Sequence, residues 1–191
     1  MYRKWLAVIS ALFLSAASLS GCGSDTGGLA TSSLSATTTT GILDSDVANW
    51  VDSTTNAKST TWTGSYTIPA ADSVNVTVQS TAYTSSSGTA TTPLPVQIDS
   101  ATITFSPADS LSPAIQTQYQ VLGSVLSGGS VSIPVRVVSQ ELKQVLAPAL
   151  ANNSIIYNYY VTIALHVTEN GAGKSATVST KLQVYISDFI N

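Results

Sequence analysis

The C-terminal segment Tyr157–Ile186 reads YNYYVTIALHVTENGAGKSATVSTKLQVYI and carries the clearest structural pattern of the chain. Apolar and polar residues alternate over both halves, as they do in a β-strand with one buried face. The two halves flank ENGAGK, whose glycines are typical of a turn. The segment therefore predicts a long antiparallel β-hairpin. Its predicted inner residues are Tyr157, Tyr159, Val161, Ile163, Leu165 and Val167 on the first strand, and Ala176, Val178, Leu182, Val184 and Ile186 on the second.

Shorter alternating stretches precede this hairpin, at residues 62–68, 74–78, 96–105, 119–121 and 131–137. In the third stretch the apolar residues change parity between Ile98 and Ala101, which predicts either a β-bulge near Asp99-Ser100 or a strand that crosses between sheets. Pro134 predicts an edge or irregular position for the fifth stretch. About seven strands separated by turns, without a regular alternation of strands and helices, predict an all-β fold.

Two short helices are also predicted. Ser139 can cap a helix over QELKQVLA, with Leu142, Val145 and Leu146 on one side and Pro148 as its end. Earlier in the chain, Ser45 can cap a helix that carries Val47, Trp50 and Val51 on one face. A helix this short is not stable alone, so we expect Trp50 to dock it on the main domain.

The seven strands, with a short helix between the fifth and the sixth, resemble immunoglobulin and fibronectin type III domains. The resemblance implies a single antiparallel β-sandwich, with Tyr157 or Tyr159 as a tyrosine-corner residue early in the sixth strand. The sequence departs from the antibody pattern because it lacks a pair of cysteines and the tryptophan that packs against them. A fold of this kind assigns no function by itself.

The first 21 residues are organised like an export signal. Arg3 and Lys4 precede an apolar run, Trp5–Ala17, which is too short to span a bilayer and which small residues follow. Directly after them stands Cys22, the single cysteine of the 191-residue chain. One thiol cannot form an internal disulfide, so the role of Cys22 has to be inferred from the residues around it.

The stretch Leu19-Ser20-Gly21-Cys22 resembles the lipobox of bacterial lipoproteins. The resemblance implies that residues 1–21 are removed as a signal peptide and that the Cys22 sulfur carries a diacylglyceryl group. Two or more acyl chains anchor a protein stably, so the mature chain is expected at a membrane without a transmembrane helix. In lipoproteins of bacteria with two membranes, Asp directly after the cysteine favours the inner membrane. Gly23 and Ser24 follow here, which implies the outer membrane.

The predicted mature chain has three parts. Residues 22–40 are predicted to be a flexible tether, since 13 of the 18 residues in Gly23–Thr40 are Gly, Ser or Thr. Such a coil would reach roughly 25 Å. Residues 41–72 are predicted to hold the first short helix and the first strand, and residues 73–191 to form the β-sandwich domain.

Composition excludes several function classes. Charged residues make up 9% of the chain, and after loss of Arg3 and Lys4 five cationic residues face ten acidic ones, a net charge of −5. Nucleic acid is not expected as a partner, because phosphate binding needs clustered lysine and arginine. His166 and Cys22 cannot supply the three or four ligands of a zinc site. Asp44, Asp46 and Asp52 lack the ligand spacing of a calcium loop, so we expect no metal and no cofactor.

The candidate binding surface is the outward side of the hairpin. If the turn centres near Gly171-Ala172, Tyr160 lies opposite Gln183 and diagonal to Tyr185, with His166 on the same side. Two interpretations stay open. The rings and their polar neighbours could bind a sugar or a partner protein, or they could be a cross-strand pair that only stabilises the sheet or that the predicted Trp50 helix covers. Trp62 is a further candidate aromatic residue.

These observations favour a lipid-anchored cell-envelope protein whose β-sandwich is a non-catalytic interaction or structural module. The alternative is a module that binds carbohydrate or another envelope polymer through Tyr160, Tyr185 and Trp62. An enzyme is not expected, because no nucleophile with a matching base and no G-x-S-x-G motif is recognisable. The expected partners are membrane lipid, through Cys22, and an envelope protein or polysaccharide.

Overall fold

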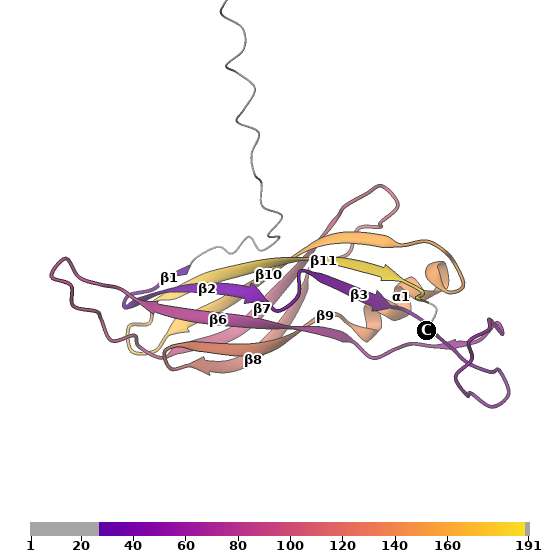
Figure 1. The fold of residues 1–191 in the computed structure, drawn as a ribbon, viewed down its shortest axis with the longest axis horizontal. Coiled ribbons are helices and arrows are strands. Elements are labelled where there is room, and N and C mark those ends of the chain that lie inside the picture. The colour runs from indigo at the N-terminus through magenta and orange to yellow at the C-terminus, as the bar shows by residue number, and fades with distance from the viewer. Residues whose placement is uncertain (1–26, 190–191) are drawn as a thin grey trace, which may run out of the picture.

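The predicted hairpin is present and forms the centre of the larger sheet (Figure 1). The computed structural model describes residues 27–189. Its five-stranded sheet has the order β3 (Ile42–Asp46), β11 (Ser175–Ser187), β10 (Tyr157–Glu169), β7 (Val96–Pro107) and β8 (Gln118–Leu126). Neighbouring strands are antiparallel, except that β3 runs parallel to β11.

A second sheet packs against the first. It has the order β1 (Gly27–Gly28), β2 (Ser32–Thr38), β6 (Asp72–Ala82) and β9 (Ser130–Val138), all antiparallel. The inner residues of both sheets belong to one core, in which Val76 and Val135 from the smaller sheet and Ile163 and Leu165 from the larger one are fully buried. Burial of each such side chain contributes about 1.5–3 kcal/mol. The described chain is therefore all-β, with two sheets around a single core.

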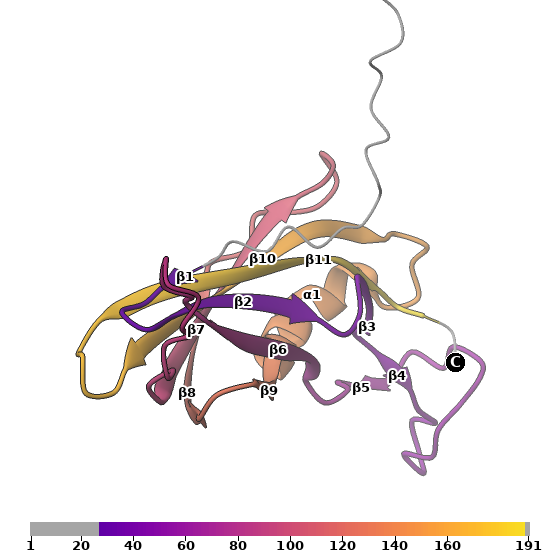
Figure 2. The same cartoon turned by 60° about the vertical axis from the view of Figure 1, so that its left-hand side comes forward.

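Two small elements complete the described chain. The short strands β4 (Asn49–Trp50) and β5 (Tyr66–Thr67) pair at the base of a projecting segment, residues 49–67, which we call the arm. The arm projects from one end of the elongated molecule, whereas β1 lies towards the other end (Figures 1 and 2). The helix α1 (Gln140–Leu150) follows β9. No helix among residues 27–189 is long and apolar enough to cross a membrane.

Several local predictions are confirmed. The inner residues predicted for the hairpin are buried, apart from Tyr157 and Ala176, which are half-buried. The register between β7 and its neighbours shifts around Asp99, which confirms the bulge. Pro134 lies on β9, an edge strand. Ser139 caps α1 through a 3.1 Å hydrogen bond that its hydroxyl accepts from the Leu142 N–H.

Helix α1 differs from its prediction in two ways. It continues past Pro148 to Leu150, because a proline in the last turn removes only one hydrogen bond of the helix. Val145, predicted on the inner side, is 74% exposed. Its place on the buried side is taken by Lys143, whose Nζ lies 2.8 Å from the Asp72 Oδ2 and 2.7 Å from the Ala70 carbonyl oxygen.

The predicted tether over residues 22–40 is wrong from residue 27 onward, the first residue described. Strand β2 pairs with β6 along its whole length, from Ser32 opposite Ala82 to Thr38 opposite Val76. Leu34 and Ala36 are buried in the core, and Ser32 is buried beside them. Hydroxyl-rich composition indicates disorder, but a strand needs only alternate residues to face the core. The sandwich therefore begins before residue 41.

The helix predicted over residues 45–51 is also wrong, because this stretch ends β3 and forms β4. Ser45 does not cap a helix; it is buried and donates a 2.6 Å hydrogen bond to the Asp72 Oδ2. Parallel pairing of β3 with β11 outweighs the weak helical pattern, since a helix of two turns has little stability of its own. Trp50 nevertheless packs against the core, now from a strand.

The predicted tyrosine corner is absent at Tyr159. This ring is fully buried and packs edge-on against Phe105, with the ring centroids 5.7 Å apart. Its hydroxyl donates a 2.9 Å hydrogen bond to the carbonyl of Pro113, in the connection between β7 and β8. A tyrosine corner instead reaches backbone a few residues upstream. Tyr159 therefore ties the β7–β8 connection to the core.

Candidate functional site

The outward face of the five-stranded sheet carries most of the predicted surface residues. Tyr160 lies opposite Gln183 on β11, as predicted, and opposite Ser106 on β7. Gln183 in turn pairs with Ile42 on β3. Tyr160 is 59% exposed and Ile42 is 52% exposed. A row of four side chains therefore crosses this face from β7 to β3.

Polar contacts hold the neighbouring side chains in place. The Gln183 amide Nε2 donates a 3.0 Å hydrogen bond to the Asn158 Oδ1. Asn158 pairs with Tyr185, which pairs with Asp44 and is half-buried. The structure thus brings Tyr160, Gln183 and Tyr185 together at one end of the sheet face.

The other two predicted surface residues lie elsewhere. His166 is on the same face, six residues further along β10, which is about 20 Å at strand spacing. Its ring lies between two hydroxyls, with the Nε2 2.9 Å from the Thr102 Oγ1 and the Nδ1 3.3 Å from the Thr177 Oγ1. Trp62 is on the arm, so the predicted residues do not form one site.

Trp62 belongs to an aromatic cluster on the arm. Its ring stacks on Tyr66, with a centroid distance of 6.2 Å and an angle of 23° between the planes. It meets Trp50 edge-on, with the centroids 5.6 Å apart. Such pairs stabilise a segment by about 0.5–1.5 kcal/mol each, so this cluster explains how a long arm keeps its shape.

Strand β8 adds exposed apolar residues to the same sheet face. Tyr119, Val121 and Val125 are 68%, 74% and 48% exposed. Their cross-strand partners on β7 are Thr102, Ser100 and Gln97. The alternation of apolar and polar residues along β8 predicts a strand. It does not show which face of this strand is buried, because β8 lies at the edge of the sheet.

An open groove lies beside this edge, between α1 and the segment Pro113–Gln120. Its volume is about 700 Å³, within the range of small-molecule sites. Ile103, Leu142 and Leu146 contribute apolar surface, and Arg136 and Glu141 contribute one charge of each sign. The Arg136 N–H donates a 2.9 Å hydrogen bond to the Gln120 side chain, which links β9 to β8.

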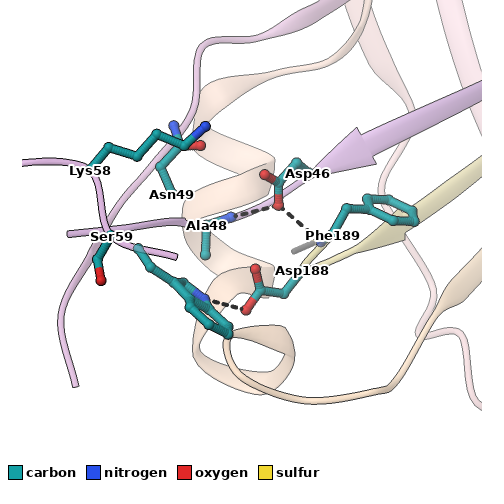
Figure 3. A pocket seen from close by; sticks show the side chains of 8 residues that line it. Asp46, Ala48, Asn49, Lys58, Ser59, Asp188 and Phe189 are labelled. Atoms are coloured by element: carbon teal, nitrogen blue, oxygen red, sulfur yellow. Dashed lines mark hydrogen bonds between the residues drawn. The ribbon is translucent and has the colours of Figure 1, made fainter. Parts of the chain in front are cut away.

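A much smaller pocket, of about 10 Å³, lies at the base of the arm (Figure 3). It is lined by Asp46, Ala48, Asn49, Trp50, Lys58, Ser59, Asp188 and Phe189. Asp46 Oδ1 accepts hydrogen bonds of 3.3 Å from the N–H groups of Ala48 and Phe189. Burial, and to a smaller extent the charge of Asp188, raise the pKa of Asp46 above its ordinary value despite these bonds.

Asp188 is the more buried of the two carboxylates, with 9% of its surface exposed. Its Oδ2 accepts a 2.8 Å hydrogen bond from the Trp50 indole N–H and a second from the Asn152 N–H. Its Oδ1 is buried and has no hydrogen-bond partner among the described residues. The two carboxylates are 142 positions apart in sequence, so no spacing rule could have paired them.

The described residues carry an exposed apolar sheet face, an open groove and a small pocket. Residues 27–189 hold no cluster of three or more His, Cys, Asp or Glu side chains that could hold a metal. Cys22, the predicted lipid attachment residue, lies outside the described residues. Comparisons of the chain with protein-family models and with curated proteins found no match.

Proposed function

We propose that this chain is a lipid-anchored cell-envelope protein whose β-sandwich is a non-catalytic interaction module. The observation that carries the proposal is the exposed aromatic and apolar surface of the five-stranded sheet, where Tyr160, Tyr119 and Val121 are each more than half exposed. Exposed apolar groups gathered on one face are typical of protein interaction sites. Tyrosine is enriched in such sites because it combines an apolar ring with a hydrogen-bonding hydroxyl.

The proposed anchor is Cys22, acylated after removal of residues 1–21. Support comes from the Leu19-Ser20-Gly21-Cys22 stretch and the apolar run before it. Only four residues separate Cys22 from β1, so the domain would begin within about 18 Å of the lipid attachment. In a host with two membranes we propose the outer one, because Gly23 and Ser24 follow the cysteine.

An immunoglobulin-like connectivity is part of this proposal. The orders β2-β6-β9 and β11-β10-β7-β8 fit strands A, B and E in one sheet and strands G, F, C and C′ in the other. Helix α1 then occupies the connection between strands E and F. The sheet face that bears Tyr160 and Tyr119 would be the outer face of the second sheet.

Site-specific photo-crosslinking in intact cells tests the interaction face. A photoreactive phenylalanine analogue replaces Tyr160 or Tyr119, and in the control it replaces Tyr83, which is 38% exposed beyond the end of β6. We expect a discrete adduct from positions 160 and 119 and none from position 83. Adducts of equal yield at all three positions, or at none, would contradict the proposal.

Binding of an envelope polysaccharide is a second candidate, favoured by the exposed Tyr160 ring beside the Gln183 and Asn158 amides. Stacking on one aromatic ring contributes about 0.5–1.5 kcal/mol, so Tyr160→Ala should weaken binding up to about tenfold. Trp62→Ala is the control, because Trp62 lies on the arm. Affinity electrophoresis in gels that contain the purified polysaccharide measures both variants. Unchanged mobility of the wild-type protein in these gels would exclude this candidate.

A further inference from the structure

The small pocket at the base of the arm joins three segments that lie far apart in the sequence. Asp46 ends β3, Asp188 follows β11, and Asn49, Lys58 and Ser59 belong to the arm. Both carboxylates point into this pocket. The Asp188 oxygen that makes no hydrogen bond lies on the side of Asp46 (Figure 3). The pocket therefore lies where the arm meets the sandwich.

The Oδ1 atom of Asp188 is buried without a hydrogen-bond partner among the described residues. A buried polar atom in this state destabilises the folded protein, and more so when the group is charged. Native proteins rarely keep such an atom, and a bound ion or an ordered water commonly supplies the missing contact. Trp50 and Asn152 hold the side chain in place through its other oxygen, so the Oδ1 remains aimed into the pocket.

Asp46 makes the pocket more negative. Two carboxylates that share a small, partly buried space repel each other, and a cation between them removes that cost. Both acidic residues line the pocket, and the N–H groups of Ala48 and Phe189 hold the Asp46 carboxylate in place through its Oδ1. Lys58 lines the pocket, but its side chain is exposed and extends past Asn49 (Figure 3).

We propose that this pocket binds one divalent cation, Ca²⁺, through the carboxylates of Asp46 and Asp188. Its volume of about 10 Å³ fits a single small occupant. Ca²⁺ takes six to eight oxygen ligands in a flexible geometry, and here water can complete the set beside the two carboxylates. Two carboxylates with otherwise neutral oxygens suit the weak affinity of extracellular calcium modules, about 10⁻⁴–10⁻³ M.

The proposed site departs from the sequence expectation of no metal. The sequence expectation considered Asp46 together with Asp44 and Asp52, its neighbours in sequence. In the structure, Asp46 instead lines one pocket with Asp188. The cation would fix the arm to the sandwich, because Asp188 also holds the Trp50 indole. Through the ring contacts of Trp50 with Trp62, and of Trp62 with Tyr66, the fixed geometry would extend along the arm.

The test uses the mature chain with Cys22→Ser, which keeps every described residue. Isothermal titration with CaCl₂ and thermal unfolding at constant ionic strength report binding and stability, and tryptophan fluorescence reports the arm. We expect saturable binding of one Ca²⁺ and a rise in Tm of a few degrees at saturation. Asp46→Asn and Asp188→Asn should each abolish the calcium response, and Asp44→Asn, an exposed residue on the same strand, should keep it.

Two further features keep the test decisive. Asp46→Asn retains an oxygen that can accept from Ala48 and Phe189, so this variant should fold even if Asp188→Asn does not. Lys58→Gln removes the cationic side chain that lines the pocket and should tighten calcium binding several-fold if Ca²⁺ is the occupant. No saturable binding up to about 10 mM CaCl₂, or a response that Asp46→Asn leaves unchanged, would overturn the proposal in favour of a bound water.

Discussion

Glu169, at the end of β10, is hydrogen-bonded to Thr31, 138 residues earlier in the chain. The Thr31 backbone N–H and hydroxyl both donate to the Glu169 Oε1, and the Ala30 N–H donates to the Oε2 at 2.8 Å. Glu169 is fully buried. One carboxylate therefore joins the segment that precedes β2 to the turn end of the central hairpin.

Replacing this carboxylate should destabilise the domain. Glu169→Gln loses the charge that strengthens three hydrogen bonds, and hydrogen bonds to a charged group contribute about 1.5–3 kcal/mol. We expect a loss of about 2–3 kcal/mol in the free energy of unfolding, measured by urea denaturation. Glu141→Gln, at an exposed position in the first turn of α1, is the matched control and should lower the denaturation midpoint much less, because the Glu141 carboxylate is already exposed to solvent. Equal shifts of the midpoint for both variants would contradict the role given to Glu169.

The same carboxylate makes stability depend on pH. Burial opposes ionisation of Glu169, but the hydrogen bonds from Thr31 and Ala30 and the nearby Lys174 outweigh it, so its pKa lies below the ordinary value. A group whose pKa is lower in the folded state stabilises the protein above its unfolded pKa, here about 4.5. This contribution is lost as the pH falls from that value through the folded pKa. Urea unfolding between about pH 3 and 6 should show a steeper loss for wild type than for Glu169→Gln.

The buried ion pair of Lys143 with Asp72 gives a prediction about α1. Lys143→Met leaves Asp72 without its cation, and breaking a buried pair costs about 3–5 kcal/mol. Because the Asp72 side chain is 29% exposed, we expect the lower part of that range. Adding Asp72→Asn should recover part of the loss, because the unpaired charge is then removed. Additive losses in this double-mutant cycle would show that the two side chains do not interact.

Strand β2 can be distinguished from a flexible tether by one substitution. Leu34 is 1% exposed, so Leu34→Ala should lower the free energy of unfolding by about 2–5 kcal/mol. Leu111→Ala is the control, since Leu111 is 70% exposed and should change stability by less than about 0.5 kcal/mol. If residues 22–40 were a tether, neither substitution would alter the denaturation midpoint.

The features that could be predicted from the sequence depend on neighbouring residues. Alternation predicts the hairpin, a change of parity predicts the bulge at Asp99, and a hydroxyl followed by a helical pattern predicts the Ser139 cap. Counting from the turn also places Tyr160 opposite Gln183, because register in a tight hairpin follows from the turn position.

Features that depend on distant residues could not be predicted in this way. Strand β2 is rich in serine and threonine and becomes ordered only by pairing with β6, about 40 residues later. Likewise β3 is a strand because β11 supplies its hydrogen bonds. The pocket of Asp46 and Asp188 depends on that same pairing, since β3 and β11 end side by side.

Attachment of the domain to a membrane through Cys22 underlies the proposed function, and mass spectrometry of the protein extracted from its own membranes tests it most directly. We expect an N-terminal peptide that begins at Cys22 and carries the added mass of a diacylglyceryl group on sulfur. Recovery of residues 1–21 in the mature protein, or of Cys22 with a free thiol, would contradict this attachment.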